Sequence, residues 1–566
     1  MKAVHSMRRR QHIVLALVAL GVTACGQSPA PEQPRGEAVD SLIVNANCYT
    51  LAYGELHRFS TMAVRDGRVV AIGDTALAER FDAKQSVDVE GKTILPGLID
   101  AHGHVSSLGV LRNSLDLAGT ASLDSALNQI AAYDRELPNT QKWLLGRGWN
   151  QVLWEGQAFP SAADIDAVVD ERAVFLNRID GHAAWANSTA LELAGINDDT
   201  IDPPGGKIVR DENGAATGVL IDAAMTLVTR VIPAPTAAQE RQHLRTAMVE
   251  LASLGITGVH DAGTTATEVR LLQDLADKGE MPVRISAMLG GMETLAQFDA
   301  PIPSYADDLL AVTSVKLYAD GALGSRGAAM IDDYSDDPGN QGLLFANEEG
   351  LADMIGQAHA KGFAAHIHAI GDRANQATLS AFAEVNDNAP TEFHDRIEHA
   401  QVIALDDIQR FADLDIVASV QPTHATSDMN MAEDRVGSER ILGAYAWQRL
   451  LKAGVRLAGG SDFPVEKPEM FDGLYAAVAR RDKQGNPVDG WYPDQALSRE
   501  QARAAFTTWA ADSVNQGDRI GELTPGMWAD FIVIDRDYFD IPEIEIWQIE
   551  TLQTWVGGKR VFTRTP

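Results

Sequence analysis

Apolar and polar residues alternate over short stretches at both ends of the chain. From Ser41 to Thr93 the alternation runs through SLIVNANCYTL and MAVRDGRVVAIG, with a DG turn at Asp66-Gly67. Such a pattern is typical of short strands joined by tight turns. Similar strand-like runs return at 530–535 and 555–561. We therefore expect residues 41–93 and 515–566 to build one small β domain together.

The middle of the chain, residues 94–514, alternates strand-like runs with helical ones, which is the pattern of a parallel α/β fold. Eight strands close a barrel of this kind. The count requires residues 105–250 to form one large insertion, which has its own candidate strands, Lys142–Gly148 and Ala173–Arg178. The eight barrel candidates are Ile94–His102, Ile256–Asp261, Val283–Leu289, Ser314–Asp320, Phe363–His368, Arg396–His399, Ile416–Gln421 and Arg456–Asp462.

The N-terminus is typical of an exported lipoprotein. Three arginines, Arg8 to Arg10, precede an apolar run from Ile13 to Val22 that is about half as long as a membrane span. The run ends in Val-Thr-Ala-Cys25, which resembles a bacterial lipobox. We expect residues 1–24 to be a lipoprotein signal peptide, Cys25 to be lipidated, and residues 25–40 to form an extended tether. The alternative is a plain signal peptide cut nearby. Both interpretations predict export, and the lipobox predicts a periplasmic or outer-membrane lipoprotein.

Composition narrows the possible partners. The 566 residues carry a formal net charge of −32, which argues against nucleic acid because its binding depends on Lys and Arg contacts to phosphate. The cysteines, Cys25 and Cys48, stand outside any CxxC motif and cannot build a disulfide framework. Cys48 is therefore expected to be a free, buried thiol. The sequence leaves the oligomeric state open.

Candidate chemistry gathers where the predicted barrel strands end, which is where barrel active sites lie. His102 and His104, two residues apart in a strand, point to the same side and could share a metal ion. In Val315–Asp320, alternation directs Lys316, Tyr318 and Asp320 into the barrel. A buried lysine is costly without a role: it is either part of a structural ion pair or carboxylated by CO₂ to bridge two metals.

The later strands complete the set. His366 and His368 share a face in Phe363–His368, and His368 is nearer the mouth, so we interpret it as a ligand and His366 as a deeper support. His399 ends the sixth strand and Asp462 the eighth. Each residue alone has an ordinary structural explanation, but their joint placement at strand ends indicates a metal centre.

The order HxH, Lys, His, His, Asp resembles the amidohydrolase superfamily. Longer phrases narrow the resemblance to the amidohydrolase 3 family, which includes N-substituted formamide deformylase. These phrases are PGLIDAHGH, KLYADGALGSR, HAIGDRA, IEHAQ, SVQPTH, GSDFPVE and GELTPGMWADFIVID, and the similarity runs from about Ser41 to Val561. The resemblance implies an α/β fold, a (β/α)₈ TIM barrel with a small β-sandwich domain assembled from both chain ends.

The resemblance also implies a ligand set. His102, His104 and Asp462 would hold one ion, His368 and His399 a second, and carboxylated Lys316 would lie between them. Zinc suits these ligands, although another divalent metal, and one ion or two, are both compatible with the sequence. A metal-activated hydroxide would attack a substrate carbonyl, and Asp462 would carry the proton to the leaving nitrogen.

Substrate contacts are expected from loops beyond the strands. His182, in the family phrase NRIDGHAAWANSTAL, would lie near the scissile group or cap a loop. Asp320, Arg326 and His424 follow strand ends. Arg326 could clamp a carboxylate or pair with a nearby aspartate such as Asp332 or Asp333.

The resulting hypothesis is a metal-dependent amidohydrolase that cleaves a non-peptide C–N bond of a small molecule, of the amide or formamide type. Ester, lactone or carbamate hydrolysis at the same site is an alternative. A lipoprotein that binds a ligand without catalysis is another, which the complete ligand set opposes.

Overall fold

The computed structural model describes residues 36–52, 54–169, 171–179 and 181–565. The expected signal peptide, lipobox and Cys25 lie outside the described residues. Among the described residues, no helix has both the length and the apolar character that a membrane span requires.

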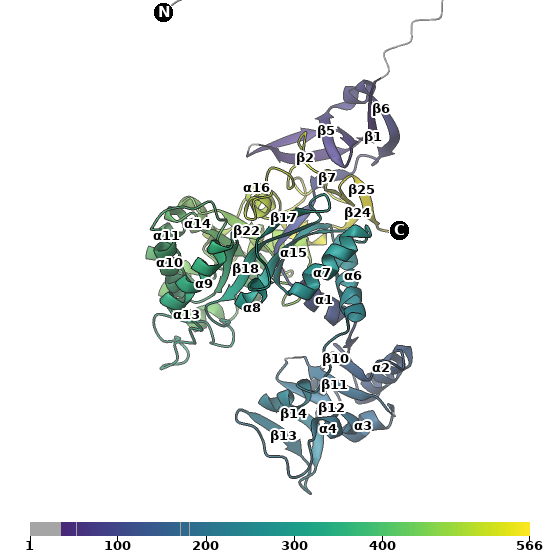
Figure 1. The fold of residues 1–566 in the computed structure, drawn as a ribbon, viewed down its shortest axis with the longest axis vertical. Helices are drawn as coiled ribbons and strands as arrows, with labels where there is room; N and C mark the ends of the chain where they lie inside the picture. Colours follow the sequence, from purple (N-terminus) through teal and green to yellow (C-terminus); the bar gives the residue numbers. More distant parts are fainter. Residues whose placement is uncertain (1–35, 53, 170, 180, 566) are drawn as a thin grey trace, which may run out of the picture.

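The α/β fold class is confirmed. Across the described residues, eight parallel strands follow one another around a barrel from β8 to β22 (Figure 1). An isolated bridge between Gly103 and Phe463 joins the first strand to the segment after the last. The barrel strands are β8 (Leu98–Gly103), β15 (Ile256–Thr264), β16 (Arg284–Gly290), β18 (Leu310–Tyr318), β19 (Ala364–Ala369), β20 (Arg396–His399), β21 (Val417–Val420) and β22 (Leu457–Gly459).

The first predicted barrel strand, Ile94–His102, is divided in the structure. Thr93–Pro96 form β7, which pairs with β23 (Phe531–Ile534) outside the barrel, and β8 begins at Leu98. Gly97 separates the two strands, and a Cβ there would lie 2.2 Å from the Thr257 side chain. Glycine therefore lets the chain pass from one sheet to the other against β15.

Helices cover the outside of the barrel. In α6, Thr236 and Gln239 form a capping box at the N-terminus, and Thr265 and Glu268 do the same for α7. Their apolar faces join the strands in one large core. The covering helices include α6 (Ala237–Ser253), α7 (Ala266–Asp277), α9 (Glu348–Ala360), α10 (Asp372–Val385), α11 (Ile408–Asp413), α14 (Trp447–Lys452), α15 (Met470–Ala479) and α16 (Arg499–Ala505).

Both chain ends contribute to a β-sandwich beside the barrel, as predicted. One sheet has the order β5-β4-β1-β6, and the other, β25-β24-β23-β7-β2-β3, combines strands from the two ends. An apolar core that includes the free, buried Cys48 lies between them. The strands are β1 (Glu37–Val44), β2 (Asn47–Ala52), β3 (Glu55–Phe59), β4 (Thr61–Arg65), β5 (Arg68–Gly73), β6 (Phe81–Asp88), β24 (Thr551–Val556) and β25 (Lys559–Thr563).

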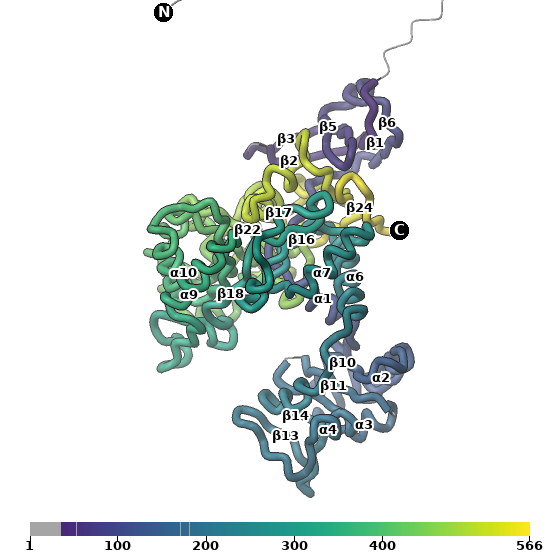
Figure 2. Tube along the Cα trace, viewed as in Figure 1, coloured from purple at the N-terminus to yellow at the C-terminus, as the bar shows by residue number. Residues whose placement is uncertain are grey.

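The segment after β8 contains a separate domain that projects from the barrel (Figure 2). Its sheet has the order β13-β14-β12-β11-β10-β9. Of the expected insertion 105–250, the two ends form α1 (Val105–Arg112) and α6, which pack on each other and in the barrel core. The insertion domain is made of β9 (Leu115–Asp116), α2 (Leu123–Glu136), β10 (Trp143–Trp149), α3 (Ala162–Asp166), β11 (Ala173–Arg178), β12 (Ala183–Ala186), α4 (Ser188–Ala194), β13 (Gly206–Arg210), β14 (Ala216–Asp222) and α5 (Thr226–Thr229).

Candidate metal centre

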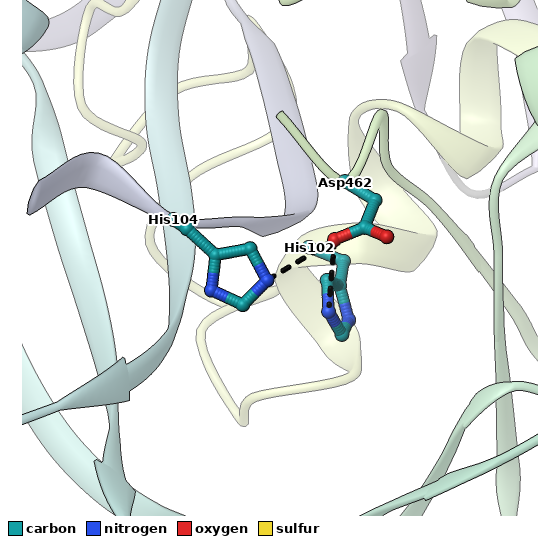
Figure 3. Close-up of side chains that lie close together, drawn as sticks. All are labelled: His102, His104 and Asp462. Carbon is teal, nitrogen blue, oxygen red and sulfur yellow. Dashed lines mark hydrogen bonds and ion pairs between the residues drawn. The ribbon is translucent and has the colours of Figure 1, made fainter. Parts of the chain in front are cut away.

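His102, His104 and Asp462 meet at the mouth of the barrel (Figure 3). His102 lies at the end of β8, His104 directly follows this strand, and Asp462 follows β22. Backbone hydrogen bonds hold these two segments together. The Asp462 amide donates to the His102 carbonyl at 2.7 Å, and the His104 amide donates to the Phe463 carbonyl at 2.8 Å. The closing seam of the barrel therefore brings residues from opposite ends of the domain together.

The ring nitrogens that face Asp462 carry lone pairs. His104 Nδ1 lies 2.7 Å from the Ala262 carbonyl oxygen, which can only accept, so the proton of a neutral His104 is on Nδ1. Its Nε2 then points an unprotonated lone pair at Asp462 Oδ1, 3.1 Å away. A carboxylate oxygen and an unprotonated ring nitrogen at this distance repel each other unless a proton or a metal cation lies between them. This donor set therefore fits a divalent metal such as zinc.

Glu398 orients His102 from beneath. Its buried carboxylate accepts a hydrogen bond from His102 Nδ1, which directs His102 Nε2 toward Asp462 Oδ1 at 3.6 Å. Burial alone raises the pKa of Glu398, but Arg396, with Nε 2.8 Å from Oε1, and the His102 imidazole lower it well below its usual value. Glu398 thus stays ionised and fixes the tautomer of His102, as outer partners of metal-binding histidines commonly do.

The interpretation of the sequence did not include Glu398. The signal was present, because Arg396 and Glu398 alternate with Ile397 and so point into the barrel, by the same argument that selected Lys316.

Lys316 lies inside the barrel, as its alternation predicted, and is 1% exposed. Its Nζ lies 3.1 Å from His102 Nε2 and 4.9 Å from the centre of the Tyr318 ring. Burial lowers the pKa of Lys316 to about 8, although Glu398 and Asp462 oppose the shift. The amine is therefore next to the candidate ligands and partly neutral near neutral pH.

His399 reaches the site through an unusual backbone conformation. The Arg396 and Glu398 side chains point inward, so regular alternation would direct His399 outward, but its φ is +75°. The His399 ring lies 4.9 Å from the His102 ring, and its Nδ1 is held 2.8 Å from Gln421 Oε1. Burial and the neighbouring His368 lower the pKa of His399 well below its usual value, so the ring is neutral.

A second candidate ligand group consists of His399, His424 and Asp462. His424 Nε2 is buried, has no hydrogen-bond partner among the described residues, and lies 3.7 Å from Asp462 Oδ2. His424, expected to contact substrate, is thus also placed to bind metal. Burial alone raises the pKa of Asp462, but the His104, His102, His399 and His424 imidazoles hold it below its usual range.

His368, predicted as a ligand, lies beside this group with its ring 4.5 Å from the His399 ring. Its Nε2 is 3.3 Å from the Gly321 carbonyl and 3.4 Å from Asp320 Oδ1. His366 lies deeper, as expected, with Nε2 3.1 Å from the His394 carbonyl and Nδ1 3.8 Å from Glu398 Oε1.

Two of the predicted substrate-contact residues, Asp320 and Arg326, have protein partners in the structure. Asp320 is buried, and its carboxylate accepts three backbone amides, from Ala329, Ile370 and Gly371. Arg326 makes a two-point ion pair with Asp336, at 3.0 and 2.8 Å, and not with Asp332 or Asp333.

His182, Trp149 and Trp154 lie in the insertion domain. The exposed His182 ring has Nδ1 2.8 Å from Asp222 Oδ1. Trp149 and Trp154 are buried in an apolar core with Trp185 and have a structural role there.

Comparison with known proteins places this site in a family. A model of the amidohydrolase family matches residues 85–562. The protein LONG AFTER FAR-RED 3 of Arabidopsis thaliana is 34% identical over 94% of this chain and 92% of its own length. N-substituted formamide deformylase of Arthrobacter pascens is 29% identical over 93% of this chain and 99% of its own length. The crystal structure of an uncharacterized metal-dependent hydrolase from Pyrococcus horikoshii OT3 superposes with a TM-score of 0.75 at 28% identity, covering 89% of this chain and 99% of that chain. The sequence phrases, the barrel and its histidine-rich mouth agree with these matches, and the chain belongs to the amidohydrolase family.

Proposed function

We propose that the protein is a metal-dependent hydrolase that cleaves a non-peptide C–N bond, of the amide or formamide type, in a small molecule. The observation that carries the proposal is the convergence of His102, His104 and Asp462, with a ring nitrogen of each histidine directed at the carboxylate. The name of the Arthrobacter relative, a formamide deformylase, supports this class of bond.

His102, His104 and Asp462 would hold one metal ion. His399 would hold a second metal ion. His368 and His424 are the neighbouring imidazoles that could also bind this ion. A bound zinc ion supplies Lewis acidity and makes water a nucleophile near neutral pH.

The protein's own residues then supply proton transfer and orientation. Asp462 is ionised at neutral pH, so one of its oxygens can accept a proton from the attacking water and return it to the leaving nitrogen. Glu398 keeps the His102 ring in its orientation. Asp320 holds the backbone at 329 and 370–371 in place, and we keep His182, Asp320, Arg326 and His424 as proposed substrate contacts.

We also propose that Lys316 is carboxylated. The neutral amine attacks CO₂, a N–C bond forms, one proton leaves to solvent, and the product carbamate is an anion with two oxygens. The burial of Nζ and its 3.1 Å distance from His102 Nε2 support this proposal, because a carbamate formed on Nζ would lie next to the candidate ligands.

A substrate screen tests the function. Metal-loaded protein is assayed with N-substituted formamides, other amides, and esters or lactones of matched size, with a chelated sample as the control. Metal-dependent turnover of the formamides or amides is expected. Turnover confined to esters or lactones would favour the alternative bond class. No turnover of any substrate by protein with full metal content would favour a ligand-binding role.

A further inference from the structure

A cleft of about 300 Å³ lies where α1 meets the insertion domain. We call it the junction cleft, and we define it by Val110 and Leu111 of α1, Arg147 of β10, Phe175 and Asn177 of β11, and Pro464. This volume is at the lower end of the range of small-molecule sites. The walls are mostly apolar, with a few polar groups among them.

Two of the polar groups, Arg147 and Asn177, come from one face of the insertion sheet. In the β10–β11 pairing, Leu145 lies opposite Phe175 and Arg147 opposite Asn177. Leu145 and Phe175 belong to the apolar core on that face of the sheet. Arg147 and Asn177 extend the same face beyond that core and line the cleft.

Both groups lack partners. Among the described residues, the Arg147 side chain makes no ion pair and no hydrogen bond. This is notable in a chain with 79 acidic and 47 basic residues, where an arginine readily finds a carboxylate. Within the part of the chain that the structure describes, Asn177 Oδ1 is buried without a hydrogen-bond donor, which is a costly state for a polar atom. A ligand with a carboxylate and a nearby N–H group would satisfy both residues.

Some residues that line the cleft belong to the segments that follow the candidate metal ligands. Helix α1 begins directly after His104, and Ser107, on its first turn, also lines the cleft. Pro464 follows Phe463, whose carbonyl accepts the His104 amide at 2.8 Å. Residues beside both His104 and Asp462 therefore form one wall of the cleft, and the insertion domain forms the other.

From this arrangement we propose that the junction cleft binds the part of the substrate remote from the scissile bond, and that Arg147 selects substrates with a carboxylate on an apolar body. The proposal rests on the proposed hydrolase function, in which the cleavable bond lies at His104 and Asp462. Arg147 offers two parallel N–H groups to a carboxylate, while Val110, Leu111 and Phe175 contact the apolar body. Arg147 is thus a specificity residue, separate from the groups that perform hydrolysis.

Binding of a simple probe pair tests the proposal without turnover. Titration calorimetry on the metal-loaded full chain compares 4-phenylbutyrate with its uncharged amide, 4-phenylbutyramide. We expect Arg147→Gln to weaken carboxylate binding by about tenfold or more, because hydrogen bonds to a charged group are lost. Binding of the amide should change by less than about twofold. Arg135→Gln, which removes the same charge from the exposed surface of α2, should change neither.

A second variant guards against misfolding of the first. Val110 is 40% exposed on the cleft wall, so Val110→Glu should fold normally. It should weaken binding of the carboxylate probe more than that of the amide, because the new charge repels the ligand or pairs with Arg147. Equal carboxylate affinity in the wild type, Arg147→Gln and Val110→Glu would overturn the proposal. Absent turnover in the substrate screen, with this selectivity intact, would instead count against the hydrolase function alone.

Discussion

Two of the candidate ligands have backbone conformations that few side chains adopt. His399 has φ +75° and Asp462 has φ +61°, each directly at the end of a barrel strand. Positive φ in residues other than glycine is uncommon and is concentrated at functional sites. In His399 the positive φ turns the side chain away from the outward direction that regular strand alternation would give. Both side chains lie beside the other candidate ligands.

Asp462 is the residue on which proton transfer depends. Asparagine has nearly the same size but cannot accept the proton of the attacking water. We expect Asp462→Asn to lower kcat by roughly 10²–10⁴-fold while circular dichroism stays unchanged. The assay is run at saturating metal with metal content measured in parallel, and Asp489→Asn serves as the control. Near-normal turnover with normal metal content would refute the assigned role.

Lys316 offers a test with chemical rescue. Lys316→Ala should lose most activity, because neither the amine nor its carbamate remains near His102. Adding acetate or propionate should restore part of the rate, since a free carboxylate can take the position of the carbamate. Exposed Lys92→Ala is the matched control. A high-resolution density map of metal-loaded protein that shows an unmodified Lys316 amine turned away from the histidines would contradict carboxylation.

The elements position the site through the seam between β8 and the segment after β22. Gly103 stands between His102 and His104, and a Cβ on it would lie 2.1 Å from the Phe463 ring. The Phe463 backbone in turn binds His104. The absence of a side chain at Gly103 thus allows the close approach that brings His104 and Asp462 together.

A methyl group at this seam should disturb both stability and the site. We expect Gly103→Ala to cost about 1–3 kcal/mol in the free energy of unfolding, as overpacking does, and to reduce metal affinity because Phe463 must move. Denaturant unfolding and metal titration measure the two effects. Gly356→Ala is the control, since no heavy atom lies within 4 Å of its added Cβ in helix α9. If Gly103→Ala changed neither the free energy of unfolding nor the metal affinity, the proposed role of Gly103 at the seam would be wrong.

At the scale of the whole molecule, a buried ion pair joins the barrel to the β-sandwich. Arg284 of β16 binds Asp530, next to β23, through Nε–Oδ2 at 2.6 Å and Nη2–Oδ1 at 3.0 Å. Both side chains are about 5% exposed or less. Water therefore cannot compensate either charge if its partner is removed.

Removing one partner should be more harmful than removing both charges. Arg284→Met should lower the free energy of unfolding by about 3–5 kcal/mol, because Asp530 stays buried and unpaired. Arg284→Met with Asp530→Asn should recover part of this loss, since the amide oxygen can still accept the Gly557 N–H. Urea denaturation compares the two with Arg65→Met, which breaks an exposed pair and should have little effect. A double variant no more stable than the single would contradict this account.

The prediction of a lipid anchor also concerns the whole molecule. We propose that Cys25 carries the lipid anchor and that the protein is exported. In detergent-phase partitioning of protein expressed in a bacterium that processes lipoproteins, the wild type should enter the detergent phase and Cys25→Ser the aqueous phase, because the lipid supplies the membrane affinity. Identical partitioning of the two would argue for a plain signal peptide.

The sequence by itself determined the class of the fold and most of the candidate site. Strand alternation identified the barrel strands and placed Lys316, His102 and His104 on inward faces, because a period of two fixes the side of each residue. It also indicated that the two chain ends share one β domain. The alternation within each strand is local, so a pattern along the chain can carry it.

Only the tertiary structure decided how the ligands meet and which groups support them. The positive φ of His399, the binding of Glu398 to His102 and the placement of His424 beside Asp462 depend on contacts between strands far apart in sequence. The same holds for the junction cleft, whose two walls come from the barrel and from the insertion domain. Alternation predicts the face on which a side chain lies, but the partner that it meets there is set by closure of the barrel and by the packing of the insertion domain against α1.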